Sequence, residues 1–197
     1  MLNEILNDLK EGKIVCLADT PDLENEIDMM CLACKATPEN IGRMITEARG
    51  LVCCALSAEI VDKMGLEKIE SEKISEDRLG TPFFMPLDLN NGSTGVSAVE
   101  RSKTAMRLAT GEATLDEFVA PGHLMTLRAR PGLLKERLGH TEFSVALAKM
   151  CGVEGAAVIC EMIKDDGEMM RVKDFEEWNK DLKLYSMTEF LGEDYNG

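Results

Sequence analysis

The chain has 197 residues, of which 45% are hydrophobic and 29% charged, and its formal net charge at pH 7 is -14. Such an acidic chain repels the phosphates of nucleic acids and of anionic lipids, so we expect no nucleic-acid partner and no membrane attachment. Because no apolar run is long enough to cross a bilayer and the N-terminus does not resemble a signal peptide, we expect a cytoplasmic protein. Most of the seven cysteines lie in apolar runs, which indicates reduced core thiols.

Hydrophobic periodicity and capping residues predict alternating helices and strands. The expected helices run from Leu2 to Gly12, from Thr37 to Gly50, from Ser57 to Gly65, from Ser97 to Thr110 and onward from Thr141, with shorter ones around Phe175 and at the C-terminus. The expected strands cover 14–17, 29–36, 51–56, 82–89, 124–129, 156–162 and 184–185, and 67–79 is expected to be an exposed connection. Two prolines mark 82–89 as an edge strand. The pattern predicts an α/β (α+β) fold: a single domain over 1–197 with a mixed sheet flanked by helices.

The acidic segment from Asp19 to Asp28 is the first candidate site. Glu24, Glu26 and Asp28 alternate, so in an extended chain their carboxylates point to one side and repel each other unless a cation lies among them. Oxygen ligands of this kind suit Mg²⁺ or Mn²⁺ better than zinc. The alternative is a solvated acidic loop, which is what most charge runs are.

The turn from Arg137 to Glu142 is the second candidate site, and it precedes a long segment with helical periodicity. Thr141 is predicted to be the N-cap of that helix, so backbone N–H groups, an arginine and a hydroxyl converge on one spot. Small anions such as phosphate are bound in this way. His140 beside them suits metal binding or acid–base chemistry. The alternative is an ordinary loop-to-helix junction with surface charges.

Three further features carry reactive side chains. Cys31 and Cys34 have zinc-like or redox-like spacing, but no second pair completes a zinc site, so core packing is favoured. His123 follows a Pro-Gly pair and is either a loop histidine or an active-site group. Glu161 ends an otherwise apolar strand, where a carboxylate is suited to acid–base chemistry.

Taken together, these segments resemble the 3,4-dihydroxy-2-butanone 4-phosphate synthase family of riboflavin biosynthesis. The resemblance runs in chain order over nearly the whole sequence. The matching strings are Glu24-Asn25-Glu26-x-Asp28, Gly50-Leu51-Val52-Cys53, Ser93-Thr94-Gly95-Val96-Ser97-Ala98, Pro121-Gly122-His123 with Leu127-Arg128-Ala129, Arg137-x-Gly139-His140-Thr141-Glu142, and Ile159-Cys160-Glu161 with Asp165-Asp166-Gly167.

The resemblance implies a homodimer with active sites near the subunit interface. It implies a lyase that converts D-ribulose 5-phosphate to 3,4-dihydroxy-2-butanone 4-phosphate and formate through a metal-stabilised enediol. Glu24 and His140 would bind Mg²⁺ (or Mn²⁺). The implied catalytic residues are His123, Glu161, Glu26 and Asp28. The sugar phosphate would contact Asp28, Thr94, Glu161, Arg137, Leu138, Gly139, His140 and Thr141.

The acidic segment departs from the family pattern at two positions. The family has an arginine where this chain has Leu23 and a small residue where it has Ile27. Leu23 cannot supply a fixed charge, and Ile27 is expected to stiffen a loop that must close on the substrate. Arg49 is a candidate replacement for the missing charge. Two alternatives therefore stay open: a paralogous lyase or isomerase acting on a different phosphorylated or carboxylated polyol, and a catalytically silent homologue.

Overall fold

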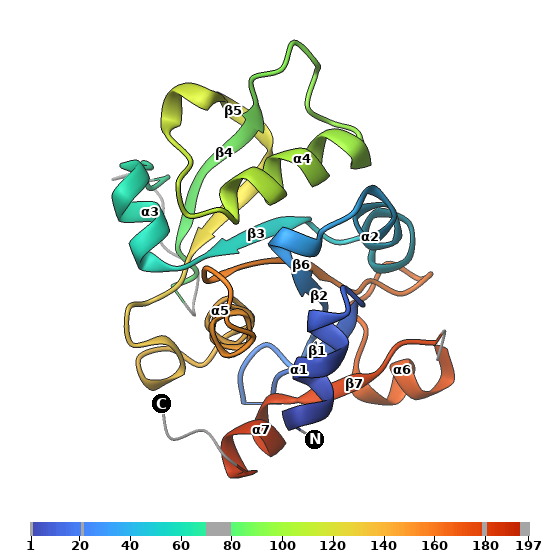
Figure 1. Ribbon diagram of the computed structural model, residues 1–197. Helices are drawn as coiled ribbons and strands as arrows, with labels where there is room; N and C mark the ends of the chain where they lie inside the picture. Colours follow the sequence, from blue (N-terminus) through green and yellow to red (C-terminus); the bar gives the residue numbers. More distant parts are fainter. Residues whose placement is uncertain (1, 21, 70–79, 179–180, 194–197) are drawn as a thin grey trace.

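A mixed sheet forms the centre of the protein (Figure 1). The structure is a computed structural model and describes residues 2–20, 22–69, 80–178 and 181–193. Its strands are β1 (Val15–Ala18), β2 (Ile27–Leu32), β3 (Cys53–Leu56), β4 (Phe83–Leu89), β5 (Phe118–Arg128), β6 (Ala156–Glu161) and β7 (Leu184–Ser186). They lie in the order β4-β5-β3-β6-β2-β1-β7, with β3–β5 and β1–β7 parallel and the other pairs antiparallel. The predicted mixed sheet and the edge position of β4 are confirmed.

Helices cover both faces of the sheet (Figure 1). They are α1 (Leu2–Lys10), α2 (Pro38–Arg43), α3 (Ala58–Met64), α4 (Ala98–Leu108), α5 (His140–Met150), α6 (Val172–Trp178) and α7 (Met187–Glu193), and a π-helical turn (Met44–Ala48) continues α2. Helices α2, α3, α4 and α6 contribute to the core on one face, and α1, α5 and α7 contribute to the core on the other. The fold is therefore a three-layer α/β/α arrangement. In the described part of the chain, no helix has the length and apolarity that a bilayer crossing requires.

Three of the predicted helix starts are confirmed by capping hydrogen bonds. The side-chain oxygens of Thr37, Ser57 and Ser97 each accept a bond from the backbone N–H three residues further on. The prediction that Thr141 is an N-cap is wrong, because α5 already begins at His140 and Thr141 is buried inside its first turn. Gly139 occupies the capping position, in an extended conformation and without a side chain to accept a bond.

Two predicted strands have different boundaries in the structure. β2 begins at Ile27, so Asp28 belongs to the sheet and lies opposite Glu161 of β6, and the strand ends at Leu32 rather than continuing to Ala36. β5 begins at Phe118, so the strand includes His123 instead of starting after it. The register between β4 and β5 shifts before Leu124, so residues 120–123 stand out from the regular ladder, and such irregularities re-aim side chains.

The predicted connection over 67–79 lies mostly outside the described residues. Its first part runs beside β4: the N–H of Ile69 donates to the carbonyl of Phe83 at 3.0 Å, and the N–H of Met85 donates to the carbonyl of Glu67 at 2.9 Å.

All seven cysteines are free thiols. Burial raises the thiol pKa of those in the core, which are Cys16, Cys31, Cys53, Cys54 and Cys160. Cys34 is half-buried and packs against the hydrophobic cores. The prediction of core packing for the Cys-x-x-Cys pair is therefore confirmed.

Candidate active site

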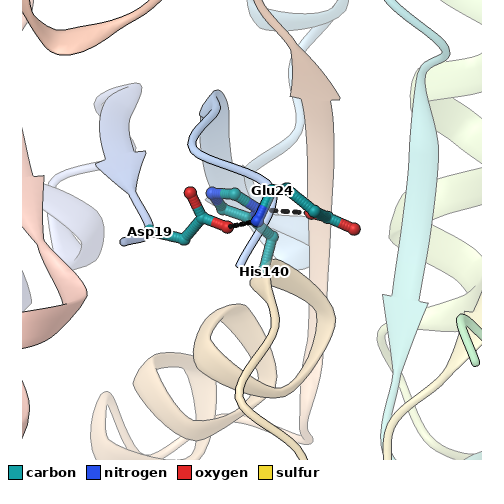
Figure 2. A group of neighbouring side chains, drawn as sticks. All are labelled: Asp19, Glu24 and His140. Atoms are coloured by element: carbon teal, nitrogen blue, oxygen red, sulfur yellow. Dashed lines mark hydrogen bonds and ion pairs between the residues drawn. The ribbon is translucent and has the colours of Figure 1, made fainter. Parts of the chain in front are cut away.

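The two candidate sites of the sequence meet at the end of β1, beside the first turn of α5 (Figure 2). Nδ1 of His140 lies 3.3 Å from Oε2 of Glu24 and 3.9 Å from Oδ1 of Asp28. His140 is buried by the elements around it, whereas Glu24 is partly exposed. Two residues that are 116 positions apart in the chain, and that were predicted to bind one metal ion, are thus brought together.

The contact made by Nε2 of His140 determines which ring nitrogen carries the proton when the ring is neutral. Nε2 lies 3.2 Å from the carbonyl oxygen of Leu17, which can only accept a hydrogen bond. Nε2 therefore carries the proton of the neutral ring, and Nδ1 presents its lone pair to the carboxylates of Glu24 and Asp28. A lone pair facing carboxylate oxygens is repulsive, so this geometry requires a proton or a cation at Nδ1. Histidine metal ligands are usually oriented through the other ring nitrogen in this way.

Negative charge is concentrated around this nitrogen. Asp28 is 3% exposed, and its Oδ1 has no hydrogen-bond partner among the residues that the structure describes. Burial raises the pKa of Asp28, and the nearby glutamates raise it further. Burial also raises the pKa of Glu26, with a contribution from Glu24. For His140, burial opposes the charged ring, but Asp28 and Glu24 outweigh it and raise the pKa. A divalent cation would balance this charge, so the residues fit a metal ion.

The acidic loop is held in a tight turn, so the expectation of an extended chain is wrong, although Glu24 and Glu26 still act on Asp28 as nearby negative charges. Asn25 has a φ of 55°, in the left-handed region. Asp19 accepts the backbone N–H groups of Glu24 and Glu26, each at 2.8 Å. Ligand atoms of Asp19, Glu24 and His140 lie within 4.8 Å of one another (Figure 2). No role is assigned to Asp19 from the sequence, although its position just after a predicted strand is a signal for a site residue.

Glu161 lies next to this cluster because of the sheet register. It ends β6 directly opposite Asp28, and its Oε2 accepts the N–H of Leu51 at 2.8 Å. Gly50 makes this approach possible, because a Cβ at that position would lie 2.3 Å from the Glu161 carbonyl oxygen. The helical segment itself ends at Ala48, and Arg49 with a φ of 72° is its C-cap, so the prediction that Gly50 terminates it is wrong.

His123 lies apart from the cluster of Asp19, Glu24, Asp28 and His140. It is on β5, which is separated from β6 by β3, so two strand spacings, or roughly 10 Å, divide it from Glu161. Its Nδ1 lies 2.6 Å from Oδ2 of Asp88, and its backbone N–H donates to Oδ1 of Asp88 at 2.8 Å. The His123 side chain is 51% exposed, whereas that of Asp88 is 10% exposed. Asp88 was not predicted to be a site residue, although a carboxylate within the apolar run of an edge strand is a signal for one.

Thr94 belongs to the His123 side of the molecule. The next residue, Gly95, has a φ of 76°, and a Cβ there would lie 2.1 Å from the carboxyl carbon of Asp88. A Cβ at Gly122 would likewise lie 2.2 Å from the backbone of Leu87. Both glycines therefore permit the chain to close around Asp88, which places exposed Thr94 beside it.

The predicted phosphate turn provides backbone donors, but its arginine is engaged within the protein. Nη1 of Arg137 donates to Oε2 of the fully buried Glu142 at 2.6 Å, and Nη2 donates to the hydroxyl of Thr81 at 2.9 Å. Leu138 is exposed, and a Cβ at Gly139 would lie 2.2 Å from Nη1 of Arg137. The Arg137–Glu142 pair thus shapes the turn, and Gly139 at the N-cap position has no side chain to cap the first N–H groups of α5.

The departures in the acidic segment have a simple structural basis. Ile27 is fully buried in β2, so it belongs to the core, and the expectation that it stiffens a loop is wrong. Leu23 packs against the core on the α5 face. Arg49 donates to Asp165 at 2.6 Å. The guanidinium that contacts the acidic loop belongs to Arg171, whose Nη1 donates to the carbonyl of Glu24 at 3.0 Å and to that of the following residue.

Comparisons with known proteins agree with this geometry. Residues 3–189 match the family model of 3,4-dihydroxy-2-butanone 4-phosphate synthase. The riboflavin biosynthesis protein RibBA of Bacillus mycoides is 41% identical over 192 residues, which cover 96% of this chain and 48% of the relative. A 3,4-dihydroxy-2-butanone 4-phosphate synthase of Wolinella succinogenes is 37% identical over 192 residues, which cover 96% of this chain and 55% of the relative. The chain thus spans about half the length of these curated relatives.

Solved structures extend the likeness to the fold. RibBX, a two-domain 3,4-dihydroxy-2-butanone 4-phosphate synthase from A. baumannii, superimposes with a TM-score of 0.89 at 36% identity, over 96% of this chain and 56% of the other. A 3,4-dihydroxy-2-butanone 4-phosphate synthase in complex with two magnesium ions gives 0.86 at 28% identity, over 97% and 94%. With the family model matched over nearly its whole length, the chain belongs to the 3,4-dihydroxy-2-butanone 4-phosphate synthase family.

Proposed function

We propose that this chain is a magnesium-dependent lyase that converts D-ribulose 5-phosphate to 3,4-dihydroxy-2-butanone 4-phosphate and formate in riboflavin biosynthesis. The observation that carries the proposal is the position of His140 Nδ1, which lies 3.3 Å from Oε2 of Glu24 and 3.9 Å from the unpartnered Oδ1 of buried Asp28. The carboxylate oxygens suit Mg²⁺ or Mn²⁺, and the imidazole nitrogen of His140 would add one further ligand. The magnesium complex of a structurally similar synthase supports this choice.

Proton transfer is the task of the surrounding side chains. When bound, the cation would stabilise the oxyanion that develops as a ketose forms its enediol. Asp28 and Glu26 have raised pKa values, and a carboxyl group with a pKa closer to neutrality can both accept and return a proton. Glu161 lies opposite Asp28 and keeps a fixed direction through its bond to Leu51, so it is placed to exchange protons with the same substrate.

His123 is suited to act as a second acid–base group because Asp88 orients its ring. Asp88 accepts the Nδ1 proton, which leaves Nε2 as the basic nitrogen of the ring. The ring is half-exposed, and its strand lies two strand spacings, roughly 10 Å, from the strand of Glu161, so within one chain it is separated from the carboxylates. We therefore propose a homodimer in which His123 and Thr94 of one chain face the carboxylate cluster of the second copy.

The phosphate of the substrate is assigned to the start of α5. The N–H groups of the first turn are not capped by Gly139, and the positive end of the helix dipole lies there. Arg137 fixes the shape of the turn through its pair with Glu142. The cation and the phosphate would then bind the same sugar at neighbouring sites, because His140 is the first residue of the same helix.

A second candidate function is a lyase or isomerase that acts on another phosphorylated polyol. The observation that favours it is the packing of partly buried Leu23 against the core, where the family pattern has a charged arginine. The two candidates differ in substrate, whereas the cation site and the phosphate site are common to both.

The test is incubation of purified protein with ribulose 5-phosphate and Mg²⁺, with formate measured directly. We expect formate from the wild type and from Lys149→Ala, a control at the exposed end of α5 whose side chain pairs with Glu59. We expect none after EDTA treatment and none from His140→Ala. Formate that persists with EDTA would contradict the cation site. No formate from folded protein would contradict the substrate and favour the second candidate.

A further inference from the structure

The backbone of the acidic loop is held from outside by two side chains. Asp19, just after β1, accepts the N–H groups of Glu24 and Glu26 at 2.8 Å. Arg171, just before α6, donates from Nη1 to the carbonyl oxygen of Glu24 at 3.0 Å and to that of Asn25. A carboxylate thus binds the N–H groups of the turn, and a guanidinium binds its carbonyl groups.

The turn needs this support because of its conformation. Asn25 has a left-handed φ of 55°, which for a residue other than glycine costs about 1 kcal/mol. The turn also brings the carbonyls of Glu24 and Asn25 to one donor, and two partly buried carbonyl groups without a donor would be unfavourable. Without Arg171, a more extended loop would become competitive, and the Glu24 carboxylate would turn away from His140.

Arg171 is itself anchored on both sides. Its backbone N–H donates to Oδ2 of Asp174 at 2.9 Å, in the first turn of α6. The preceding residue, Met170, is buried, and its N–H donates to the carbonyl of Met162 at 2.8 Å, immediately after β6. The guanidinium therefore extends from a backbone fixed to the same strand that carries Glu161.

We propose that Arg171 is a positioning residue of the cation site, which acts by fixing the Glu24–Asn25 turn so that Glu24 faces His140. Its contacts are with backbone oxygens, so it shapes the loop rather than binding the cation or the substrate. The inference rests on the proposed function, because it presupposes that a divalent cation binds Glu24 and His140. In this chain, where Leu23 is apolar and core-packed, the arginine of the acidic loop is supplied from the entrance of α6.

The experiment measures Mn²⁺ binding without substrate, from the electron paramagnetic resonance signal of the free ion. Arg171→Ala should weaken Mn²⁺ binding by about ten- to a hundredfold, which is typical when a residue supporting a metal ligand is removed. Arg171→Lys, with one compact ammonium group, should lie between the alanine variant and the wild type. Arg107→Ala is the matched control, since Arg107 also donates to a loop carbonyl and to a carboxylate but lies on α4.

A double variant separates positioning from general destabilisation. If Arg171 acts through Glu24, then Arg171→Ala should have no further effect on Mn²⁺ binding in a Glu24→Gln background. Equal losses in both backgrounds, or wild-type affinity in Arg171→Ala, would overturn the inference while leaving the proposed function intact. If the alanine variant does not fold, Arg171→Lys decides by the same comparison. A wild type that binds no Mn²⁺ would overturn the cation site itself, and this inference with it.

Discussion

Replacing Asp88 with asparagine should slow catalysis while leaving the fold intact. An asparagine carbonyl can still accept the backbone N–H of His123, a bond of 2.8 Å. The ring contact changes, because the charged oxygen 2.6 Å from Nδ1 is replaced by an amide group. An amide that donates to Nδ1 would favour the tautomer with the proton on Nε2, which is the nitrogen assigned to proton transfer.

The expected loss follows from the single bond that is altered. A hydrogen bond to a charged group contributes about 1.5–3 kcal/mol, and each 1.36 kcal/mol is a factor of about ten in rate. Asp88→Asn should therefore lower kcat/KM by about ten- to 150-fold. His123→Ala removes the acid–base group entirely and should cost about 10²–10⁴-fold. The double variant should be no slower than His123→Ala, because Asp88 acts only through the ring.

The assay is the initial rate of formate release over a range of ribulose 5-phosphate concentrations. Asp62→Asn is the matched control: Asp62 also pairs with a basic side chain, that of Arg128 at 2.8 Å, but it is 63% exposed. The reasoning would be refuted if Asp88→Asn were as active as Asp62→Asn. It would also be refuted if the double variant lost the product of the two single effects.

Three further predictions concern stability. Gly50→Ala should lower the free energy of unfolding by about 1–3 kcal/mol, because the new Cβ would overlap the backbone of Glu161. The control is Gly42→Ala, where a Cβ would meet no atom within 4 Å and should cause no such loss. Equal urea midpoints for the two variants would contradict this prediction. Hydrogen bonds from Lys13 and a second lysine lower the pKa of buried Asp8 to about 2, so its contribution is complete above about pH 4 and is lost as the pH falls toward 2. Asp8→Asn should therefore cost about 1–2 kcal/mol at pH 7 and almost nothing at pH 2, and a constant difference across acid denaturation curves would argue against it. Mg²⁺ at a hundred times its dissociation constant should stabilise the protein by about 2.7 kcal/mol, and a melting temperature that EDTA leaves unchanged would speak against a bound cation.

Features that depend on a few neighbouring residues were predictable from the sequence. Ser57 and Ser97 begin helices because a hydroxyl three residues before a free N–H satisfies it locally. The edge position of β4 was likewise predictable, since its proline removes a donor that a central strand needs. The pairing of Glu24 with His140 was expected only from the family resemblance, because no local pattern relates residues so far apart.

The features that were not predicted depend on partners distant in sequence. The start of β2 is set by pairing on both sides, of Ile27 with Ala18 of β1 and of Asp28 with Glu161 of β6, and hydrophobic periodicity does not identify these partners. Gly50 was interpreted as a helix stop, although its small size serves a close approach to Glu161. Asp88 was overlooked because its function depends on His123, which is 35 positions away on the neighbouring strand.

The reactivity of the buried thiols can report local unfolding of the protein. Only a thiolate reacts readily with disulfide reagents, and burial disfavours the thiolate of the five core cysteines as well as shielding it. Each of these sulfurs becomes reactive only when the layer that covers it separates from the sheet. Cys16 and Cys160 would report on the α2 side, and Cys53 on the α5 side, so labelling rates read by mass spectrometry would show which face opens first.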